Sequence, residues 1–168
     1  FCKVIMCGIL LTSDPKYSQK EFSNALDLMN HRGPEASAST QIGNIKMGHK
    51  RLKILDLDDR SNQPFYSRDG RFALIFNGEI YNFQELAHLH SIPQHTTSDT
   101  EIIIELYARY GPKFLSWLNG MFAIVIVDII TQEIFVARDR LGIKPLYMHN
   151  LDGQLMLASE ISPILDLT

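Results

Sequence analysis

The residue of greatest chemical interest is Cys7, which directly follows Met6 and opens an apolar run. If Met6 and the residues before it were removed, Cys7 would carry both a thiol and a free α-amino group with an ordinary pKa of about 8. A thiol becomes a strong nucleophile when a neighbouring base takes its proton, and the amine of the same residue can be that base. In the sequence as it stands, Phe1 to Met6 precede Cys7, so its nitrogen belongs to a peptide bond.

Asn77 and Gly78 are candidates for stabilising negative charge, since they follow a short apolar stretch over residues 72–76. A side-chain amide and a neighbouring backbone N–H are two donors that can converge on one oxygen. Acyl-transfer chemistry needs such a pair for its oxyanion. An Asn-Gly pair equally favours an ordinary β-turn, and both interpretations remain open from the residues alone.

Arg51 and Asp99 are candidates for binding the charged groups of a substrate. A planar guanidinium suits bidentate binding of a carboxylate, and a carboxylate accepts hydrogen bonds from an ammonium. The alternatives are a solvated surface arginine and an aspartate that stabilises a helix N-terminus.

Other kinds of site find no support in the sequence. The histidines show no metal-binding spacing with cysteines or carboxylates, so no metal site is predicted; they are His31, His49, His88, His90, His95 and His149. Glycine-rich nucleotide-binding loops and the Gly-x-Ser-x-Gly motif of serine hydrolases are absent from the 168 residues.

The elements that must position these residues are mostly strands. Apolar runs and turn signals predict strands over residues 3–12, 51–55 and 72–76, the last ending at the Asn77-Gly78 turn, and hairpins over 121–137 and around 151–159. Helical spacing predicts helices over 18–30, 82–90 and 98–110, with capping boxes at Ser18/Glu21 and Ser98/Glu101. Local hairpins among more strands than helices predict an α+β fold with mainly antiparallel sheets.

Composition narrows the class of protein. The chain has 168 residues, of which 45% are apolar and 21% charged, so one folded domain with a sizeable core is expected. A net charge of −3 without a basic run argues against nucleic-acid binding, and no apolar run approaches the length of a membrane span. Two cysteines make no disulfide scaffold; a Cys2–Cys7 bridge is possible on paper, but a reducing, cytoplasmic location is predicted.

Taken together, nine stretches occur in the order of a known family. The chain resembles the glutamine-hydrolysing domain of asparagine synthetase, a class II glutamine amidotransferase, over residues 6–165. The stretches are Met6-Cys7-Gly8-Ile9, His31-Arg32-Gly33-Pro34, Gly48-His49-Lys50-Arg51-Leu52, Asn62-Gln63-Pro64, Phe76-Asn77-Gly78-Glu79-Ile80-Tyr81-Asn82, Ser98-Asp99-Thr100-Glu101, Leu118-Asn119-Gly120-Met121-Phe122-Ala123, residues 137–147 and Ala158-Ser159-Glu160-Ile161.

The resemblance implies a fold and a catalytic mechanism. The fold is the N-terminal-nucleophile αββα sandwich, in which two antiparallel sheets pack face to face between helices. Cys7 is implied as the nucleophile that attacks the side-chain carboxamide of L-glutamine and forms a γ-glutamyl thioester. Asn77 and Gly78 are implied to stabilise the oxyanion.

The resemblance also implies how the substrate is held. Arg51 would bind the α-carboxylate of glutamine, and Glu79 and Asp99 would receive its α-ammonium. The remaining substrate-binding residues that it implies are Leu52, Ile54 and Ser98.

The domain organisation is predicted as an extension over residues 1–6 and a glutamine amidotransferase type-2 domain over 7–168. The extension is interpreted as a propeptide, as residues added by cloning or as a misplaced start. No Ser-Gly-Gly-x-Asp-Ser motif for ATP chemistry is present. The domain itself is therefore expected to need no cofactor, with ATP and Mg²⁺ used only by a synthetase partner, in trans or in a missing C-terminal domain.

Two alternatives stay open. Because Cys7 is not N-terminal as written, the chain could be a catalytically inactive amidotransferase-like module for binding or docking. It could also be a different amide hydrolase of the same fold. The joint presence of Arg51, Asn77, Glu79 and Asp99 favours glutamine as substrate.

Overall fold

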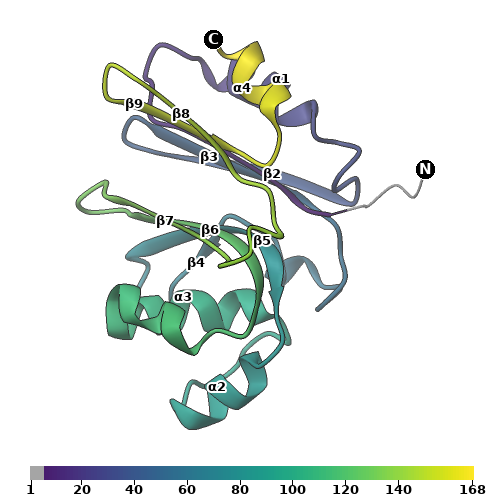
Figure 1. Ribbon diagram of the computed structural model, residues 1–168, viewed down its shortest axis with the longest axis vertical. Coiled ribbons are helices and arrows are strands. Elements are labelled where there is room, and N and C mark those ends of the chain that lie inside the picture. Colours follow the sequence, from purple (N-terminus) through teal and green to yellow (C-terminus); the bar gives the residue numbers. More distant parts are fainter. Residues whose placement is uncertain (1–5) are drawn as a thin grey trace.

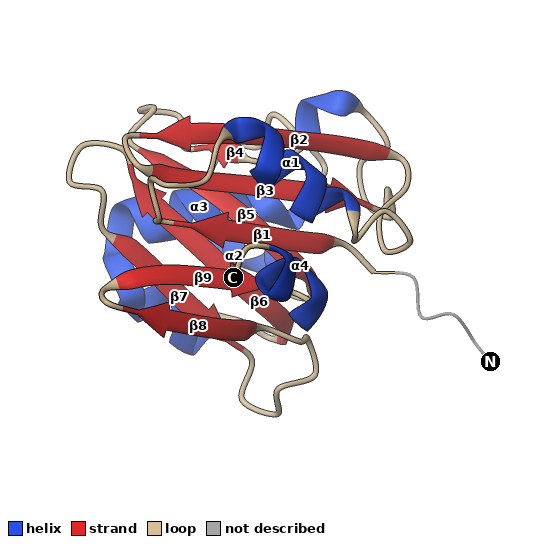
Figure 2. Ribbon diagram, turned by 90° about the horizontal axis from the view of Figure 1, so that it is seen from above, coloured by secondary structure: helices blue, strands red, loops and turns tan. Residues whose placement is uncertain are grey.

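The computed structural model describes residues 6–168, which form two β-sheets packed face to face with helices on both outer sides (Figure 1). Helices α1 (Gln19–Asp27) and α4 (Ile161–Asp166) cover one sheet. Helices α2 (Phe83–Leu89) and α3 (Asp99–Tyr110) lie outside the other sheet (Figure 2). The expected αββα sandwich and the α+β class are confirmed.

The first sheet has five strands in the order β2-β3-β1-β9-β8, and every neighbouring pair is antiparallel. Its central strand follows directly on Cys7. The strands are β1 (Gly8–Thr12), β2 (Ala36–Ile42), β3 (Ile45–Arg51), β8 (Tyr147–Leu151) and β9 (Gln154–Ala158).

The second sheet has four antiparallel strands in the order β4-β5-β6-β7. The long pair at its centre carries the Asn77-Gly78 motif. The strands are β4 (Phe65–Tyr66), β5 (Phe72–Ile80), β6 (Gly120–Asp128) and β7 (Ile134–Arg138).

Local chemistry explains where the helices begin. At α1 the Ser18 hydroxyl accepts a hydrogen bond from the Glu21 amide, and the Glu21 carboxylate accepts one from the Ser18 amide, which completes the predicted capping box. At α3 the Ser98 hydroxyl accepts from the Thr100 amide, and α3 continues into the 3₁₀ helix η2 (Gly111–Trp117). A second 3₁₀ helix, η1 (Asp59–Ser61), lies in the loop that follows β3.

Apolar side chains fill the space on both sides of each sheet. Ile9, Leu11 and Ile75 belong to the cluster between the two sheets, and all three are fully buried. Phe22 and Leu26 of α1 pack on the outer face of the five-stranded sheet, while α3 packs on the outer face of the other. No helix within residues 6–168 combines the length and the apolar character that crossing a membrane demands.

Most predicted elements are confirmed, although the helices are shorter than expected, and the structure corrects three of the predicted strands. The predicted strand over 3–12 begins at Gly8, and residues 3–5 lie outside the described part. Of the strand predicted over 51–55 only Arg51 belongs to a strand, as the last residue of β3; residues 52–55 form none, because the segment folds back so that the Leu55 carbonyl accepts a hydrogen bond from Arg51. The strand predicted to end before Asn77-Gly78 continues through both residues to Ile80.

The Asn77-Gly78 pair therefore makes no turn. Gly78 lies opposite Phe122 in the ladder between β5 and β6, and a Cβ at this position would stand 2.3 Å from the Met121 carbonyl oxygen. The glycine permits a close approach of two strands rather than a reversal of the chain.

The predicted capping box at α3 is also only half formed. The carboxylate of Glu101 accepts hydrogen bonds from the His95 and Thr96 amides in the preceding loop, so it does not reach back to Ser98.

Candidate active site

One pocket gathers nearly all the candidate residues. It opens where β1 begins, β3 ends and α3 starts, beside the last residues of β5. Asn77 is the one predicted site residue outside the lining, and both of its neighbours belong to it. The lining consists of Cys7, Arg51, Leu52, Ile54, Leu55, Ser61, Gln63, Phe76, Gly78, Glu79, Ser98, Asp99 and Thr100.

Cys7 lies half-buried just before β1 and is held from two directions. The Leu52 amide points at its Sγ at 3.4 Å, and Arg32 Nε donates to its carbonyl oxygen at 3.0 Å. Burial raises the pKa of the thiol, while the Leu52 amide and the cations Arg51, Lys144 and Arg32 oppose the rise. The position is fixed, and the thiol needs a base to become a thiolate.

Arg32 connects Cys7 to the end of the chain. Its guanidinium also pairs with Glu160, with Nη1 3.1 Å from Oε1, and His31 Nε2 lies 2.9 Å from the same oxygen. Nearby, the Ser159 hydroxyl accepts from the Ile9 amide at the start of β1. Sequence reasoning gave Arg32, Ser159 and Glu160 no role at the site, although all three lie in the motifs that carried the resemblance.

The backbone of β5 presents its donors to the pocket edge in a regular pattern. The Phe76 amide donates to Gln63 Oε1 at 2.6 Å, and the Ile80 amide donates to Asp99 Oδ2 at 2.9 Å. Amides alternate in direction along a strand, so the Gly78 N–H points to the same edge, between these two. Gly78 itself lines the pocket.

Asn77 is 1% exposed, and its Nδ2 finds no hydrogen-bond partner within residues 6–168. A buried amide donor without a partner is unusual in a folded protein. This unpaired donor is adjacent in the chain to Gly78, which lines the pocket.

His49 fixes this part of β5 from the opposite sheet. Its Nε2 lies 3.1 Å from the Phe76 carbonyl oxygen, a contact from β3 to β5 across the sandwich. Burial, the main cause, lowers the pKa of His49 to about 3, so the ring is neutral and its Nε2–H donates. His49 was considered only as a metal ligand from the sequence, and its actual contact depends on the packing of the two sheets.

Asp99 and Glu79 bring two carboxyl groups to the other end of the pocket. Asp99 begins α3, and burial together with the nearby charge of Glu79 raises its pKa to about 6. Ser98 caps the same helix, so Asp99 is free to accept from the Ile80 amide and to face the pocket.

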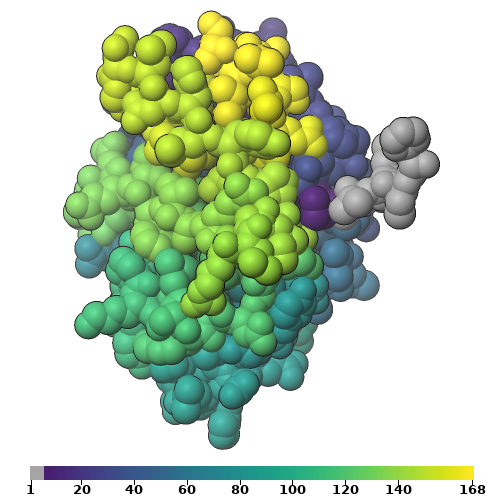
Figure 3. All heavy atoms as spheres, in the orientation of Figure 1, coloured from purple at the N-terminus to yellow at the C-terminus, as the bar shows by residue number. Residues whose placement is uncertain are grey.

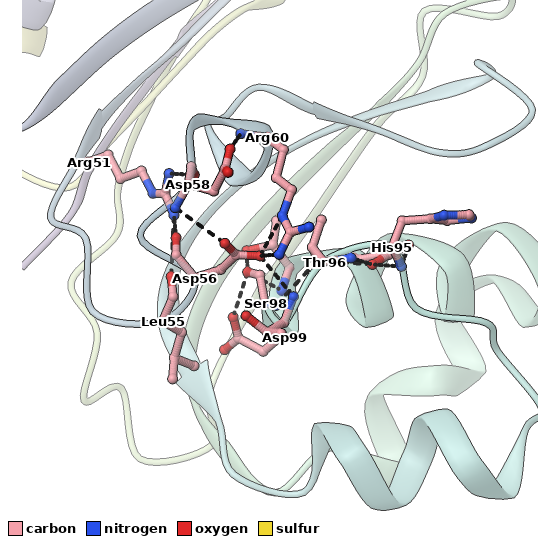
Figure 4. A network of polar contacts seen from close by, with 12 residues as sticks. Arg51, Leu55, Asp56, Asp58, Arg60, His95, Thr96, Ser98 and Asp99 are labelled. Carbon is pink, nitrogen blue, oxygen red and sulfur yellow. Dashed lines mark hydrogen bonds and ion pairs between the residues drawn. The ribbon is translucent and has the colours of Figure 1, made fainter.

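Arg51 is 5% exposed, and its guanidinium holds the loop that covers it. Nη1 donates to the Asp58 carbonyl and to Asn62 Oδ1, and Nη2 donates to the carbonyls of Leu55 and Asp56 (Figure 4). All four terminal N–H groups are used by the protein itself. The binding of a substrate carboxylate by Arg51 stays a prediction that requires this loop to adjust.

Leu52 and Ile54 complete the loop side of the pocket. Leu52 contacts Cys7 through its amide, whereas the Ile54 side chain is 67% exposed at the mouth. Within the described residues, no three histidine, cysteine or acidic side chains are grouped so that they could bind a metal ion.

Comparisons with known proteins agree on one family. A family model described as "Glutamine amidotransferase domain" matches residues 6–168. The amidase chyE of Penicillium rubens is 42% identical over 95% of the chain and 26% of its own length. The glutamine-hydrolysing asparagine synthetase 2 of Bacillus subtilis is 37% identical over 95% of the chain and 22% of its own length. The chain thus spans about a quarter of the length of the curated relatives it matches.

The fold has a counterpart among solved structures. The glutamine phosphoribosylpyrophosphate amidotransferase of B. subtilis, complexed with ADP and GMP, superimposes with a TM-score of 0.81 and 23% identity. The match covers 96% of this chain and 43% of that one. At this identity the likeness establishes the sandwich fold alone.

Proposed function

Because the chain belongs to the glutamine amidotransferase domain family and is of the asparagine synthetase type, we propose that its pocket hydrolyses L-glutamine to glutamate and ammonia. The observation that carries the proposal is the convergence of Cys7, Gly78, Glu79 and Asp99 on one pocket, although up to 92 positions separate them in the chain (99 minus 7).

The reaction begins at Cys7. Its α-amine, freed by removal of residues 1–6, takes the thiol proton directly or through a water, and the thiolate attacks the carboxamide carbon. The negative charge then develops on the former carbonyl oxygen. The Asn77 Nδ2 and the Gly78 N–H donate to that oxygen, a role supported by the unpartnered Nδ2 and by the direction of the Gly78 amide.

The second half of the reaction releases both products. The C–N bond breaks, and the nitrogen leaves as ammonia with the proton that the amine had taken. Water then attacks the γ-glutamyl thioester, its oxygen bonds to the carbonyl carbon and the C–S bond breaks. Glutamate leaves and the Cys7 thiol is restored.

Charged groups around the pocket bind the amino-acid end of glutamine. Glu79 and Asp99 accept from the α-ammonium, and Arg51 attracts the α-carboxylate once the loop over its guanidinium shifts. Leu52, Ile54 and Ser98 bound the substrate. Arg51 at the end of β3 and Asp99 at the start of α3 both line the pocket, which supports the recognition of two opposite charges on one substrate.

The ammonia passes to an asparagine-synthetase-like enzyme that forms an amide with ATP and Mg²⁺, either as a separate protein or in the rest of a longer chain. The relatives' length, about four times that of this chain, supports this part of the proposal. A cytoplasmic location, where glutamine and ATP are available, fits the same proposal.

The test compares the full chain with a chain that begins at Cys7, each with and without Cys7→Ala. All strands and helices of the described residues 6–168 begin at or after Gly8, so the shorter chain keeps each of them. We expect equimolar glutamate and ammonia from the shorter chain. The full chain should be about 10²–10⁴-fold slower, because its Cys7 lacks the amine base.

Cys7→Ala should remove glutamate formation, and Cys2→Ala in the full chain is the matched control that should change nothing. Glutamate release by the Cys7→Ala protein at the parent rate would overturn the mechanism. The intact mass of the protein from its native source tells whether residues 1–6 are removed.

A second candidate is the non-catalytic docking module, favoured by the peptide bond between Met6 and Cys7. It predicts that the chain beginning at Cys7 binds glutamine without forming glutamate. A third candidate function is the hydrolysis of another amide, which the similarity to an amidase favours. An assay with asparagine and simple acyl amides beside glutamine distinguishes this candidate.

A further inference from the structure

Lys144 is a buried cation beside the start of the described chain. Its side chain lies in the segment between β7 and β8, is 7% exposed, and places Nζ 3.1 Å from the Met6 sulfur. Figure 3 shows the purple start of the described chain lying against yellow-green surface of the later part of the sequence. A thioether is a weak acceptor, so it compensates little of the cost of burying an ammonium.

No ion pair among residues 6–168 includes Lys144. Buried cations ordinarily lie against a carboxylate, because the interior does not solvate them. Within the described residues the ammonium thus has no direct ion pair, which leaves it able to act on a negative charge that develops at a neighbouring group.

The backbone around Lys144 is held rigidly. The buried Asp139 accepts from the amides of Ile143 at 2.8 Å and of Lys144 at 3.0 Å, and Arg138 Nε donates to the Lys144 carbonyl at 2.7 Å. Asp139 also accepts from the Phe122 amide of β6. Its carboxylate is thus occupied by backbone donors, and the segment is fixed to the sheet that carries Gly78.

Besides Cys7, the residue after Met6, three charged groups act on this ammonium. Glu79 and Asp139 are the acidic ones, and Arg32 is the further cation. Burial, the largest effect, lowers the pKa of Lys144, while Cys7 and Glu79 favour its charged form. Arg51, which lines the pocket together with Cys7, also lowers the pKa of the thiol.

We propose that the Lys144 ammonium is a positioning group that favours the thiolate of Cys7 and, once Cys7 is N-terminal, the neutral form of its α-amine. A cation stabilises a nearby anion and disfavours a second cation, so one charge promotes both states that nucleophilic attack requires. No bond to Lys144 forms or breaks. The first half of the proposal, the effect on the thiolate, applies to the full chain. The second half, the effect on the α-amine, rests on the proposed function.

Alkylation tests the first half without any substrate. In the full chain with Cys2→Ser, Cys7 is the only thiol, and its rate of reaction with iodoacetamide is followed by intact mass between pH 6 and 10. Lys144→Met keeps the length and apolar stem but removes the charge. In this variant we expect the midpoint of the curve of alkylation rate against pH to move upward by about 0.5–1 pH unit. Alkylation at pH 7.5 then slows about threefold to tenfold.

Lys144→Arg keeps the charge and should retain the midpoint of the parent. Lys113→Met removes an exposed lysine that does not line the pocket and is the matched control, expected to change nothing. Lys144→Gln repeats the neutral substitution if Lys144→Met does not fold. An unchanged midpoint in a folded neutral variant, or an equal shift in Lys144→Arg, would overturn the proposal.

The second half is tested in the chain beginning at Cys7 by the pH profile of kcat/KM for glutamine. We expect the acidic limb of Lys144→Met to move to higher pH, with Lys144→Arg unchanged. If no variant turns over glutamine but the alkylation midpoint shifts, the proposed function fails while the role of Lys144 at the thiol stands. If turnover is normal and neither midpoint nor limb moves, the role of Lys144 fails and the function stands.

Discussion

At the scale of single residues, the Asp99 carboxyl group has two roles. It accepts the Ile80 amide, which fixes the end of β5, and it faces the pocket beside Glu79. Burial and the charge of Glu79 raise its pKa to about 6, so its carboxyl gains a negative charge only above that pH. An acid whose pKa is raised by folding stabilises the fold most at low pH, and this contribution is lost as the pH rises through about 6. A substrate ammonium would compensate for that loss.

Asp99→Asn tests this role. The amide oxygen can still accept from Ile80, whereas the charge for the α-ammonium is gone, so KM for glutamine should rise about tenfold or more. In the parent enzyme KM should rise as the pH falls below about 6, because protonated Asp99 cannot pair with the ammonium; the variant should lack this limb. Steady-state kinetics from pH 5 to 8 in the chain beginning at Cys7 provides the measurement. The same limb in both proteins would contradict the assignment.

At the scale of elements, the loop after β3 decides how the pocket is covered. Arg51 donates hydrogen bonds to carbonyls of this loop. Asp56 of the same loop accepts from the Thr97 amide at 2.8 Å, which connects the loop to the segment before α3. Arg60 pairs with the same carboxylate at 3.1 Å (Figure 4). Two distant segments are thereby fixed to each other through one buried carboxylate.

Asp56→Asn should loosen this loop. Although burial by itself raises the pKa of Asp56, the hydrogen bonds from Thr97 and Arg60 lower it to about 2. Its contribution to stability is therefore present at neutral pH and is lost as the pH falls from about 4 through about 2. Urea unfolding at pH 7 should show a loss of about 1–3 kcal/mol, which becomes smaller at pH 2.5.

Asp152→Asn is the matched control, because Asp152 is exposed and shares the left-handed backbone of Asp56, with φ of 52° against 47°. Asparagine tolerates this conformation as well as aspartate does, so neither substitution adds backbone strain. Equal losses in the two variants would show that the ties of Asp56 contribute nothing.

At the scale of the whole molecule, the packing of one sheet on the other assembles the site. Cys7 belongs to the entry of the first sheet, whereas Gly78 lies in the second. The cluster between the sheets sets the distance between them, and the contact from His49 to Phe76 crosses the same space. A substitution in this core should therefore change the relative positions of the pocket residues.

Ile75→Ala probes that core one residue from Phe76. Ile75 is fully buried between the sheets, and the substitution should cost about 2–5 kcal/mol in the free energy of unfolding. Ile130→Ala, at a side chain that is 75% exposed in the turn before β7, should cost less than about 0.5 kcal/mol. Urea unfolding of both proteins measures the difference. A similar small loss at Ile75 would mean that the sandwich does not depend on close packing there.

Features that depend on neighbouring residues could be predicted from the sequence. The capping box at Ser18 and Glu21 formed as expected, and the last hairpin turns at Asp152-Gly153 as predicted. Apolar periodicity and turn chemistry act over a few residues, so the α+β class and the antiparallel pairing follow from them. The ordered motifs likewise identified the family, because they are patterns along the chain itself.

Features that depend on residues far apart in the chain were decided by the tertiary structure. Residues 52–55 alternate like a strand, but the buried guanidinium of Arg51 binds the Leu55 carbonyl and the segment folds back. Asn77-Gly78 has the composition of a turn, but both residues pair with β6 as part of a strand. The neighbourhood of Met6 and Lys144 joins positions 138 apart. Such contacts exist only when two complete sheets have packed, because the energy of that packing, and not local preference, selects where each side chain lies.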